Sequence, residues 1–484
     1  MKFQKKTLGY TSNLSCNENL RPKKLALYIL PVIAMISWGS AFANCTVGKT
    51  PVNQEMEYVD ICDKENDCKK FSRLVMGTDH LIQANWVVDG QQEISDEELH
   101  AILDEAVKLG INTFDTSPIY VGNIEDKLGK WLDYKNSEIH EDGFYSNGSL
   151  NPDRNLYTIS KGGFPLDLYY SQKLDSGSHS EELLTVLREQ GLLGEKPTIT
   201  DDGGIEVKNA PSGTYSSRLY GSEEQIKSRV SGELHHTANH LSNDITVYLM
   251  HRDDADFFKF DEIDRPQTPV NRILKALSAQ EITDKVWQIG VSNWRTPRVN
   301  ESLKLASENS DLLKPVLNSP YFSLFEMSER SIHAGGIQVF HKEMSSPEFQ
   351  KGIKIMSYSP LGGFSILDKP EPRWQNAKAS AKEKYDAGDP YWKNVFYSIF
   401  TEDNRQRYER VVQFTDDFNS EHCTIYTVDQ MINAYALAHE RADMLAVGPI
   451  TIPQLRRTVA SLGLSKMLTD DDLEYLYDGV VVKQ

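Results

Sequence analysis

The sequence is poor in cysteine and carries fewer positive than negative charges. It contains five cysteines among 484 residues, too few for a disulfide-rich scaffold. Its 52 lysines and arginines are outnumbered by 70 aspartates and glutamates. The resulting net charge of −18 repels phosphate backbones, so we predict no nucleic-acid partner. The hydrophobic content of 39% and the charged content of 25% are typical of a globular protein with a sizeable core.

Near its N-terminus the sequence also lacks an apolar run as long as the ~20 residues that a membrane-spanning helix needs. The run from Leu25 to Trp38 is shorter, follows a basic stretch and precedes Ala41-Phe42-Ala43, an Ala-x-Ala pattern typical of signal-peptide cleavage. We predict that residues 1–43 are a signal peptide, with a membrane anchor as the alternative. A signal peptide predicts an exported or periplasmic protein, and the alternatives are a membrane-anchored or a cytoplasmic one. We expect any membrane contact to be made by this segment alone.

Residues 44–70 form a cysteine-containing leader ahead of the main domain. In an oxidising compartment Cys62 and Cys68 could pair, and unpaired thiols are the equal alternative. Neither their spacing nor their neighbours fit a zinc site, so we predict no metal.

From residue 71 to residue 484, short apolar runs rich in β-branched residues alternate with amphipathic helical stretches. A doubly wound sheet usually stops at five or six strands, whereas eight units close into a barrel. The predicted fold is therefore α/β, a (β/α)8 TIM barrel. The eight predicted strands are Ser72 to Met76, Thr113 to Asp115, Leu156 to Ser160, Ile245 to Met250, Trp287 to Val291, Pro315 to Asn318, Ile353 to Tyr358 and Met444 to Val447.

Helical periodicity and a cap at Ser95 and Asp96 predict a helix over Glu97 to Leu109. The same periodicity predicts helices over Gln225 to Leu241, Val270 to Leu277, Asn404 to Phe418 and Val428 to Ala438. Two long loop insertions, between Gly163 and Gly221 and between Gly363 and Asn404, follow strands at the end of a barrel where active sites form. We predict lids or substrate walls there, with plain surface loops as the alternative.

Polar groups stand at the carboxyl ends of four successive predicted strands: Asp115, Lys161, His251 and Ser292 with Asn293. Tyr120 follows the second strand. In a barrel these ends converge on one pocket. A lysine paired with a carboxylate can lower the pKa of a neighbouring tyrosine, which makes the phenol a proton donor near neutral pH.

These strand ends resemble the signatures of the aldo-keto reductases, in that family's order and over roughly residues 71 to 478. The matching segments are Ile111-Asn112-Thr113-Phe114-Asp115-Thr116-Ser117-Pro118-Ile119-Tyr120, Ile159-Ser160-Lys161-Gly162, Tyr248-Leu249-Met250-His251-Arg252, Gly290-Val291-Ser292-Asn293-Trp294 and Tyr358-Ser359-Pro360-Leu361-Gly362. The resemblance implies that Tyr120 is the general acid in the reduction of an aldehyde or ketone by hydride transfer. It implies that Lys161 and Asp115 tune Tyr120, and that His251 orients the carbonyl of a small-molecule substrate.

The resemblance also implies a nicotinamide cofactor. Ser292 and Asn293 would hold its carboxamide, with Asn318 where the family commonly has a glutamine, and Tyr358 would stack on the ring, with Ser359 and Leu361 beside it. Past the last strand, the backbone amides at a helix start favour an anion, and the guanidinium groups of Arg456 and Arg457 suit the 2′-phosphate that only NADP carries. NADP (NADPH) is therefore favoured over NAD. The residues at that helix start are Gly448, Thr451, Gln454, Arg456 and Arg457.

Two other functions remain open on the sequence alone. A regulatory or scaffold protein that binds a dinucleotide, like the potassium-channel beta subunits that share this fold, would use the same residues. A barrel hydrolase could use Asp253 and Asp254, although Asp115 is the one other carboxylate at a strand end.

Overall fold

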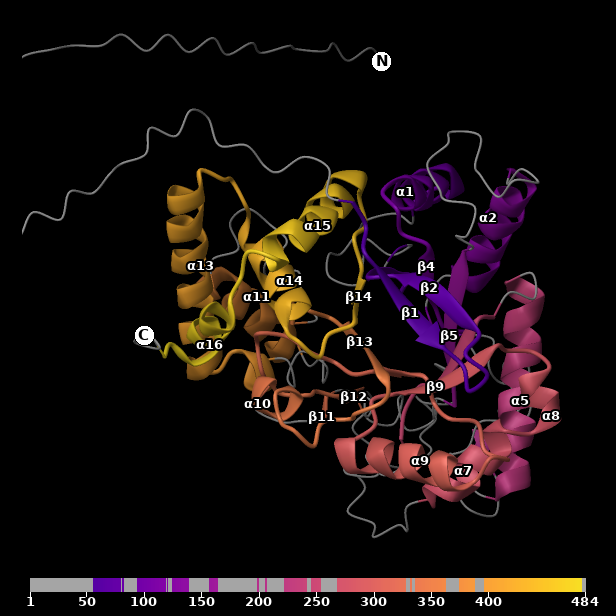
Figure 1. Ribbon diagram of the computed structural model, residues 1–484. Coiled ribbons are helices and arrows are strands. Elements are labelled where there is room, and N and C mark those ends of the chain that lie inside the picture. The colour runs from indigo at the N-terminus through magenta and orange to yellow at the C-terminus, as the bar shows by residue number, and fades with distance from the viewer. Residues whose placement is uncertain are drawn as a thin grey trace, which may run out of the picture. The chain divides into compact units, whose positions relative to one another are not determined.

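Eight parallel strands form a closed barrel in the computed structural model, and helices surround it (Figure 1). The structure describes residues 55–79, 81, 94–118, 120, 124–138, 156–163, 198–199, 205–206, 222–241, 245–253, 268–327, 331–332, 336–362, 374–387 and 396–480. The barrel strands follow one another in chain order, and the last pairs with the first. They are β3 (Leu74–Gly77), β4 (Thr113–Asp115), β5 (Tyr157–Gly162), β8 (Val247–Met250), β9 (Gln288–Ser292), β10 (Leu317–Ser319), β13 (Lys354–Tyr358) and β14 (Met444–Val447).

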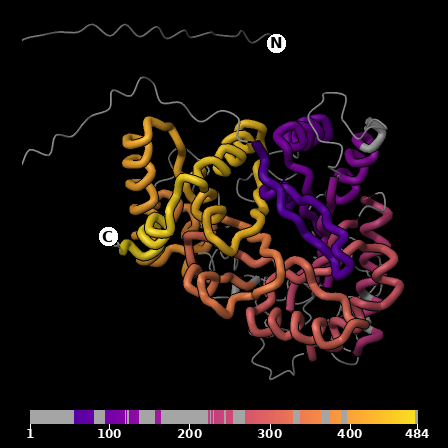
Figure 2. The backbone as a smooth tube through the Cα atoms, in the orientation of Figure 1, coloured from indigo at the N-terminus to yellow at the C-terminus, as the bar shows by residue number. Residues whose placement is uncertain are grey.

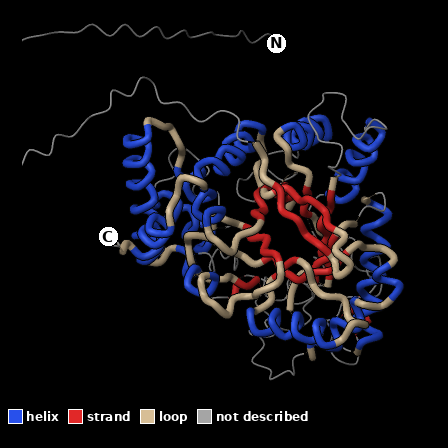
Figure 3. Tube along the Cα trace, in the orientation of Figure 1, coloured by secondary structure: helices blue, strands red, loops and turns tan. Residues whose placement is uncertain are grey.

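The helices alternate with these strands and ring the barrel, as the blue and red tubes of Figure 3 show. The chain runs once around the ring from its indigo to its yellow end (Figure 2). The helices that follow barrel strands, or lie between them, are α1 (Asp96–Lys108), α2 (Ile124–Glu138), α5 (Glu223–His240), α7 (Val270–Leu277), α8 (Gln280–Thr283), α9 (Thr296–Glu308), α10 (His341–Met344), α11 (Trp374–Asp386), α13 (Glu402–His422), α14 (Val428–Ala438), α15 (Ile452–Ser465) and α16 (Asp470–Asp478).

The side chains along each barrel strand point alternately into and out of the barrel, and this divides the hydrophobic core into two parts. Inward residues such as Ile159, Leu249 and Leu317 pack together inside the barrel. Outward residues such as Phe114 and Tyr248 pack with the apolar faces of the helices. Because successive strand residues point to opposite faces, this division fixes which side chains can reach the pocket at the barrel's carboxyl end.

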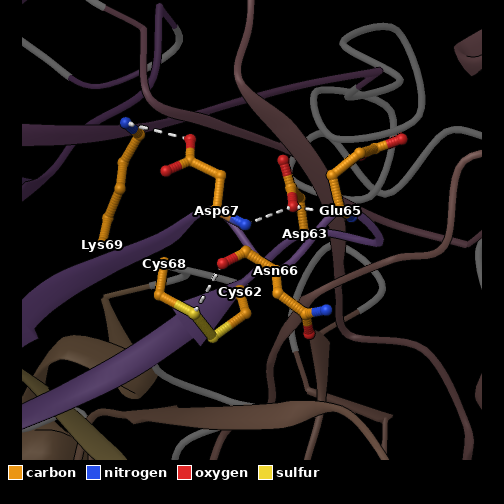
Figure 4. Close-up of a disulfide and its surroundings, with 7 residues drawn as sticks. All are labelled: Cys62, Asp63, Glu65, Asn66, Asp67, Cys68 and Lys69. Carbon is orange, nitrogen blue, oxygen red and sulfur yellow. Dashed lines mark hydrogen bonds and ion pairs between the residues drawn. A yellow bond between two sulfur atoms is a disulfide. The ribbon is translucent and has the colours of Figure 1, made fainter.

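The N-terminal end of the barrel is covered by a hairpin that the sequence does not predict. Its strands β1 (Tyr58–Cys62) and β2 (Cys68–Ser72) are antiparallel, and a disulfide between Cys62 and Cys68 joins them beside the turn (Figure 4). Ile61 and Phe71 enter the inner core, and the Phe71 ring lies 4.6 Å from that of Tyr157 at the start of β5. The hairpin therefore plugs the barrel opposite the predicted active site.

The predicted fold is confirmed, and all eight predicted strands overlap barrel strands. The cap of α1 is also confirmed: Ser95 Oγ accepts from the Glu98 amide, while the Glu98 carboxylate accepts from the Ser95 amide. Two-stranded pairs outside the barrel are β6 (Thr198–Ile199) with β7 (Ile205–Glu206) and β11 (Ser331–Ile332) with β12 (Gly336–Ile337). Within the described ranges, no helix is both long and apolar enough to cross a membrane. The predicted signal segment lies outside those ranges.

Candidate active site

Three ionisable side chains converge at the carboxyl ends of neighbouring barrel strands. Asp115 ends β4, Lys161 is the last but one residue of β5, and His251 follows β8. Lys161 and His251 lie two residues after the inward-facing Ile159 and Leu249, so alternation turns them into the barrel. All three are buried, with exposed fractions of 6%, 3% and 5% for Asp115, Lys161 and His251.

Lys161 connects Asp115 to Tyr120. Its Nζ atom forms a salt bridge with the Asp115 carboxylate and lies 2.8 Å from Oη of Tyr120. The Tyr120 hydroxyl is 3.5 Å from Oδ2 of Asp115. The carboxylate and the phenol, both from the unit of β4 and α2, and the amine from β5 therefore form one hydrogen-bonded group.

Hydrogen bonds between strands hold the backbone of this group. Thr78, just past β3, donates to the Asp115 carbonyl from its amide at 3.0 Å and from Oγ1 at 2.9 Å. Ser117 Oγ donates to the Lys161 carbonyl at 3.2 Å. The reactive side chains thus project from fixed peptide groups, which favours a preorganised site.

The pKa of the Tyr120 hydroxyl is raised well above its usual value, so the predicted lowering is wrong. Burial is the largest cause, and the charges of Asp115 and Asp79 add to it. Burial also raises the pKa of Asp115, against the opposing effect of Lys161. Because Lys161 is paired with a carboxylate, it does not act on the phenol as an isolated ammonium would. Tyr120 therefore keeps its proton at neutral pH.

The pKa of His251 lies well below its usual value. Burial is the main cause, and the positive charges of Arg252 and Lys161 add to it. The imidazole is therefore neutral at neutral pH and has one N–H donor. Its Nδ1 atom lies 3.4 Å from Ser117 Oγ, and its ring meets the Tyr120 ring edge-on with centroids 6.1 Å apart.

Ser292, Asn293 and Tyr358 form a second polar group next to the first. Asn293 has a left-handed backbone with φ of 59°, a conformation that is uncommon for residues with a side chain and that asparagine tolerates better than most. Its Nδ2 donates to the His251 carbonyl at 3.1 Å, and its Oδ1 accepts from Tyr358 Oη at 2.6 Å. Ser292 Oγ donates to the Ser319 carbonyl at 2.8 Å.

Asn318, predicted to bind the carboxamide, does not join this group. Leu317 before it faces the barrel interior, so alternation turns Asn318 outward, where Nδ2 donates to Gln350 Oε1 at 2.5 Å. The inward residue is Ser319. Its Oγ is buried and has no hydrogen-bond partner among the described residues. The predicted residue Asn318 therefore points away from the pocket, and its neighbour Ser319 points toward it.

Ser359 and Leu361 continue the chain beyond β13. Ser359 is left-handed, with φ of 53°, and its carbonyl accepts from the Gly362 amide at 3.0 Å, which closes a tight turn. Leu361 is partly buried and packs against the outer core. The turn leaves Tyr358 at the strand end, with its ring centroid 5.6 Å from that of Tyr321.

The start of α15 is open on its outer side. Thr451 caps the helix by accepting from the Gln454 amide at 3.3 Å, and Gln454 Oε1 accepts from the Ile450 amide at 3.0 Å. Gly448 is exposed, and a Cβ atom there would meet no atom of the described residues within 4 Å. A helix start with open space in front of it suits an anionic group.

Arg456 and Arg457 lie on this helix beside carboxylates. Arg456 Nε is 2.7 Å from Glu105 Oε1, and Arg457 Nε is 3.6 Å from Asp429 Oδ2. The Arg456 side chain is 59% exposed, and exposed ion pairs contribute little to stability. A phosphate monoester, which guanidinium groups bind with two parallel hydrogen bonds, can compete for them.

Asp253, one of the two aspartates of the hydrolase alternative, is fully buried and bound to Arg298. Arg298 Nη2 donates to its Oδ1 at 2.9 Å, and the side chains form a salt bridge. That pairing commits the Asp253 charge to a structural contact. Asp254 lies outside the described residues.

Part of the second insertion lies beside Tyr358. Trp374 of α11 packs with Tyr321, Ile399 and Phe400 in one apolar cluster, against which Tyr358 also packs. The described part of this insertion therefore forms an aromatic wall next to the strand end. The first insertion is described only at β6 and β7, so its role as a lid stays a prediction.

One family model, described as the aldo/keto reductase family, matches residues 73–143 and 235–478. The matched segments include Asp115, Tyr120 and His251, whereas Lys161 falls between them and is connected to the others by geometry. No curated protein matches the chain significantly.

Proposed function

The chain belongs to the aldo/keto reductase family, and from this membership we propose that it reduces an aldehyde or ketone to an alcohol with NADPH. The observation that carries the proposal is the Tyr120 hydroxyl 2.8 Å from Lys161 Nζ, with Lys161 paired to Asp115. A phenol held against an ammonium in a buried pocket is a suitable proton donor for a carbonyl oxygen.

Tyr120 donates the proton. Its raised pKa keeps it protonated over the physiological range, and an oxygen that gains alkoxide character is more basic than a phenolate. The proton therefore moves from Oη to the substrate oxygen as charge develops there. The phenolate that remains lies 2.8 Å from Lys161 Nζ, which stabilises it.

His251 orients the substrate. As a neutral ring beside Tyr120, it offers one N–H donor to the carbonyl oxygen without competing to transfer a proton of its own. Asp115 fixes Lys161 and balances its charge in the buried site. Tyr120 and His251 thus supply donors aimed at the place where negative charge develops, and Lys161, held by Asp115, stabilises the phenolate.

The residues at the strand ends suit a nicotinamide cofactor, which when bound supplies the hydride for the carbonyl carbon. Ser319 supports this fit because its buried Oγ faces the site and lacks a partner among the described residues. Ser292 and Asn293 would hold the carboxamide beside it, and Tyr358 would lie against the ring.

NADPH is proposed over NADH from the start of α15. The space at Gly448 admits a bulky group, and Thr451 and Gln454 fix the backbone at the start of the helix behind it. Arg456 and Arg457 could each exchange a weak carboxylate contact for a 2′-phosphate.

The test is turnover of a panel of aldehydes and ketones by the purified protein, with NADPH binding measured separately by fluorescence. We expect both binding and oxidation of NADPH that depends on the carbonyl compound. Binding without turnover of any member of the panel would refute the reductase proposal and favour the regulatory alternative.

We also propose that the protein is exported. Cys62 and Cys68 are joined, and Cys423 is disulfide-bonded as well. Structural disulfides persist in oxidising compartments and are rare in the cytosol. The disulfides therefore support the prediction that residues 1–43 are a signal peptide. Free NADPH is scarce outside the cytosol, so an exported reductase would carry its nucleotide across or receive it there.

A further inference from the structure

Two buried carboxylates lie behind the strand that carries Lys161, and the proposed mechanism uses neither. Glu125, at the start of α2, and Glu233, on α5, are 4% and 1% exposed. Both touch the outer face of β5, opposite the pocket. Buried carboxylates are energetically costly, so their partners indicate what they do.

Glu233 holds the backbone at the end of β5. Its Oε2 atom accepts from the Gly163 amide at 2.6 Å and from Tyr248 Oη at 2.7 Å. A hydrogen bond from an amide to a charged carboxylate is about twice as strong as one to a neutral acceptor. The peptide group between Gly162 and Gly163 is therefore tied to α5 by a strong contact, in addition to the pairing of β5 with its neighbours.

The carboxylate lies directly against the strand. A Cβ atom on Gly162 would lie 2.0 Å from Glu233 Oε2 and 1.9 Å from Tyr248 Oη, so any larger residue would push both away. Gly163 is left-handed, with φ of 72°. The two glycines after Lys161 thus allow the carboxylate to reach the backbone.

Other contacts hold the same segment. The Gly162 carbonyl accepts from the His251 amide at 2.7 Å, and the Lys161 carbonyl accepts from Ser117 Oγ at 3.2 Å. Glu233 adds support from the outer side. Because a shift of about 1 Å in a catalytic group can reduce a rate about a hundredfold, this support matters for the distance from Lys161 to Tyr120.

Glu125 is the second buried carboxylate on the outer face of β5. It accepts from Ser160 Oγ at 2.8 Å and from Thr237 Oγ1 at 3.0 Å. Burial is the main reason that its pKa is raised to about 7, and the charge of Glu233 adds to the rise. Glu125 therefore takes up a proton near neutral pH.

We propose that Glu233, with Tyr248, is a positioning residue for Lys161: by binding the Gly163 amide behind β5, it sets where the lysine Nζ atom meets Tyr120. The inference rests on the proposed reductase function for its kinetic consequence, but the hydrogen bond itself can be tested without turnover.

The experiment compares Glu233→Ala with Glu233→Gln. The alanine variant removes the acceptor, and we expect kcat to fall about ten- to a hundredfold with little change in the dissociation constant of NADPH. The glutamine variant keeps an acceptor oxygen and should restore kcat to within about threefold of the parent. Hydrogen exchange of the peptide spanning residues 156–163 should speed up in the alanine variant and not in the glutamine variant.

Tyr435→Phe is the matched control. Tyr435 is as deeply buried as Tyr248, and its hydroxyl bonds to His341 at 2.7 Å rather than to Glu233. This variant should have a lower melting temperature. Its kcat at saturating NADPH and the hydrogen-exchange rate of the peptide spanning residues 156–163 should not change. Should Glu233→Ala not fold, Tyr248→Phe removes the hydrogen bond from Tyr248 Oη to Glu233 and should raise exchange in the same peptide.

The proposal would be overturned if Glu233→Ala changed neither hydrogen exchange in residues 156–163 nor kcat. The same holds for Tyr248→Phe if that variant has to be used instead. A Glu233→Gln variant as slow as the alanine variant would also overturn it, because the acceptor would then be irrelevant. If the parent protein reduces no carbonyl, the reductase proposal fails, and the exchange rates alone decide whether Glu233 holds the strand.

Discussion

Replacing Tyr120 with phenylalanine tests the proposed chemistry most directly. The substitution removes only the hydroxyl, so the ring keeps its edge-on contact with His251, 6.1 Å between centroids. Lys161 loses one hydrogen-bond partner at 2.8 Å but keeps its salt bridge with Asp115. The expected loss of folding stability is therefore about 1 kcal/mol, the typical value for one hydrogen bond.

The effect on catalysis should be much larger. General acids typically contribute about 10²- to 10⁴-fold to a rate, or about 2.7 to 5.4 kcal/mol of activation free energy at 1.36 kcal/mol for each factor of ten. We expect Tyr120→Phe to bind NADPH as the parent does and to lose carbonyl reduction by this factor.

The assay follows NADPH absorbance with a reactive aldehyde, at saturating cofactor, alongside a fluorescence titration of binding. Tyr134→Phe, in which an exposed side chain of α2 loses its hydroxyl, is the control and should match the parent. A Tyr120→Phe variant that reduces the aldehyde at the parent rate would refute the assignment of the proton donor.

Four further predictions follow from other parts of the molecule. Because burial and Asp115 raise the pKa of Tyr120, kcat should not decline between about pH 7 and about pH 9, and a fall with an apparent pKa inside that range would contradict a raised value. Replacing Arg456 and Arg457 with alanine should reduce the preference for NADPH over NADH about tenfold or more, measured as the ratio of kcat/KM values, and an unchanged ratio would remove them from the cofactor site. Replacing Cys62 and Cys68 with serine should lower the free energy of unfolding in urea by about 2 kcal/mol and leave kcat unchanged, since the bridge closes a short loop at the end of the barrel opposite the pocket. The mature N-terminus should lie after residue 43, and an intact Met1 in the cytosolic fraction with all thiols free would contradict both export and oxidation.

The eight strands were predictable because each is a short apolar run between stretches of helical periodicity. The position of Asp115, Lys161 and His251 at strand ends follows from those boundaries and from barrel geometry. Side-chain direction needs one further step, since an error of one residue reverses it. Leu317 is an apolar residue that belongs inside, so alternation already indicated Ser319 rather than Asn318 as the inward polar residue.

Other features depend on contacts that a single sequence does not reveal. The pKa of Tyr120 follows from how deeply it is buried and from the nearness of Asp115 and Asp79, which only the folded chain determines. Glu233 looks like one more charged residue on an amphipathic helix, although the adjacent Gly162 and Gly163 are a signal for close approach at the end of β5. The hairpin of β1 and β2 is polar for much of its length, with Ile61 and Phe71 buried in the inner core and Val59 packed against it.

The closure of the ring between β14 and β3 has a consequence for biosynthesis. Leu74 pairs with Leu445, and the neighbouring Arg73 donates to the carbonyl of Leu437, 364 residues further along the chain. At about 5 to 20 residues per second, a ribosome needs roughly 20 to 70 s to supply that partner. During this interval the outer edge of β3 has no native strand to pair with. The nascent barrel therefore cannot close until its last βα unit has been made, and a chaperone that shields the early strands is expected to raise the yield of folded protein.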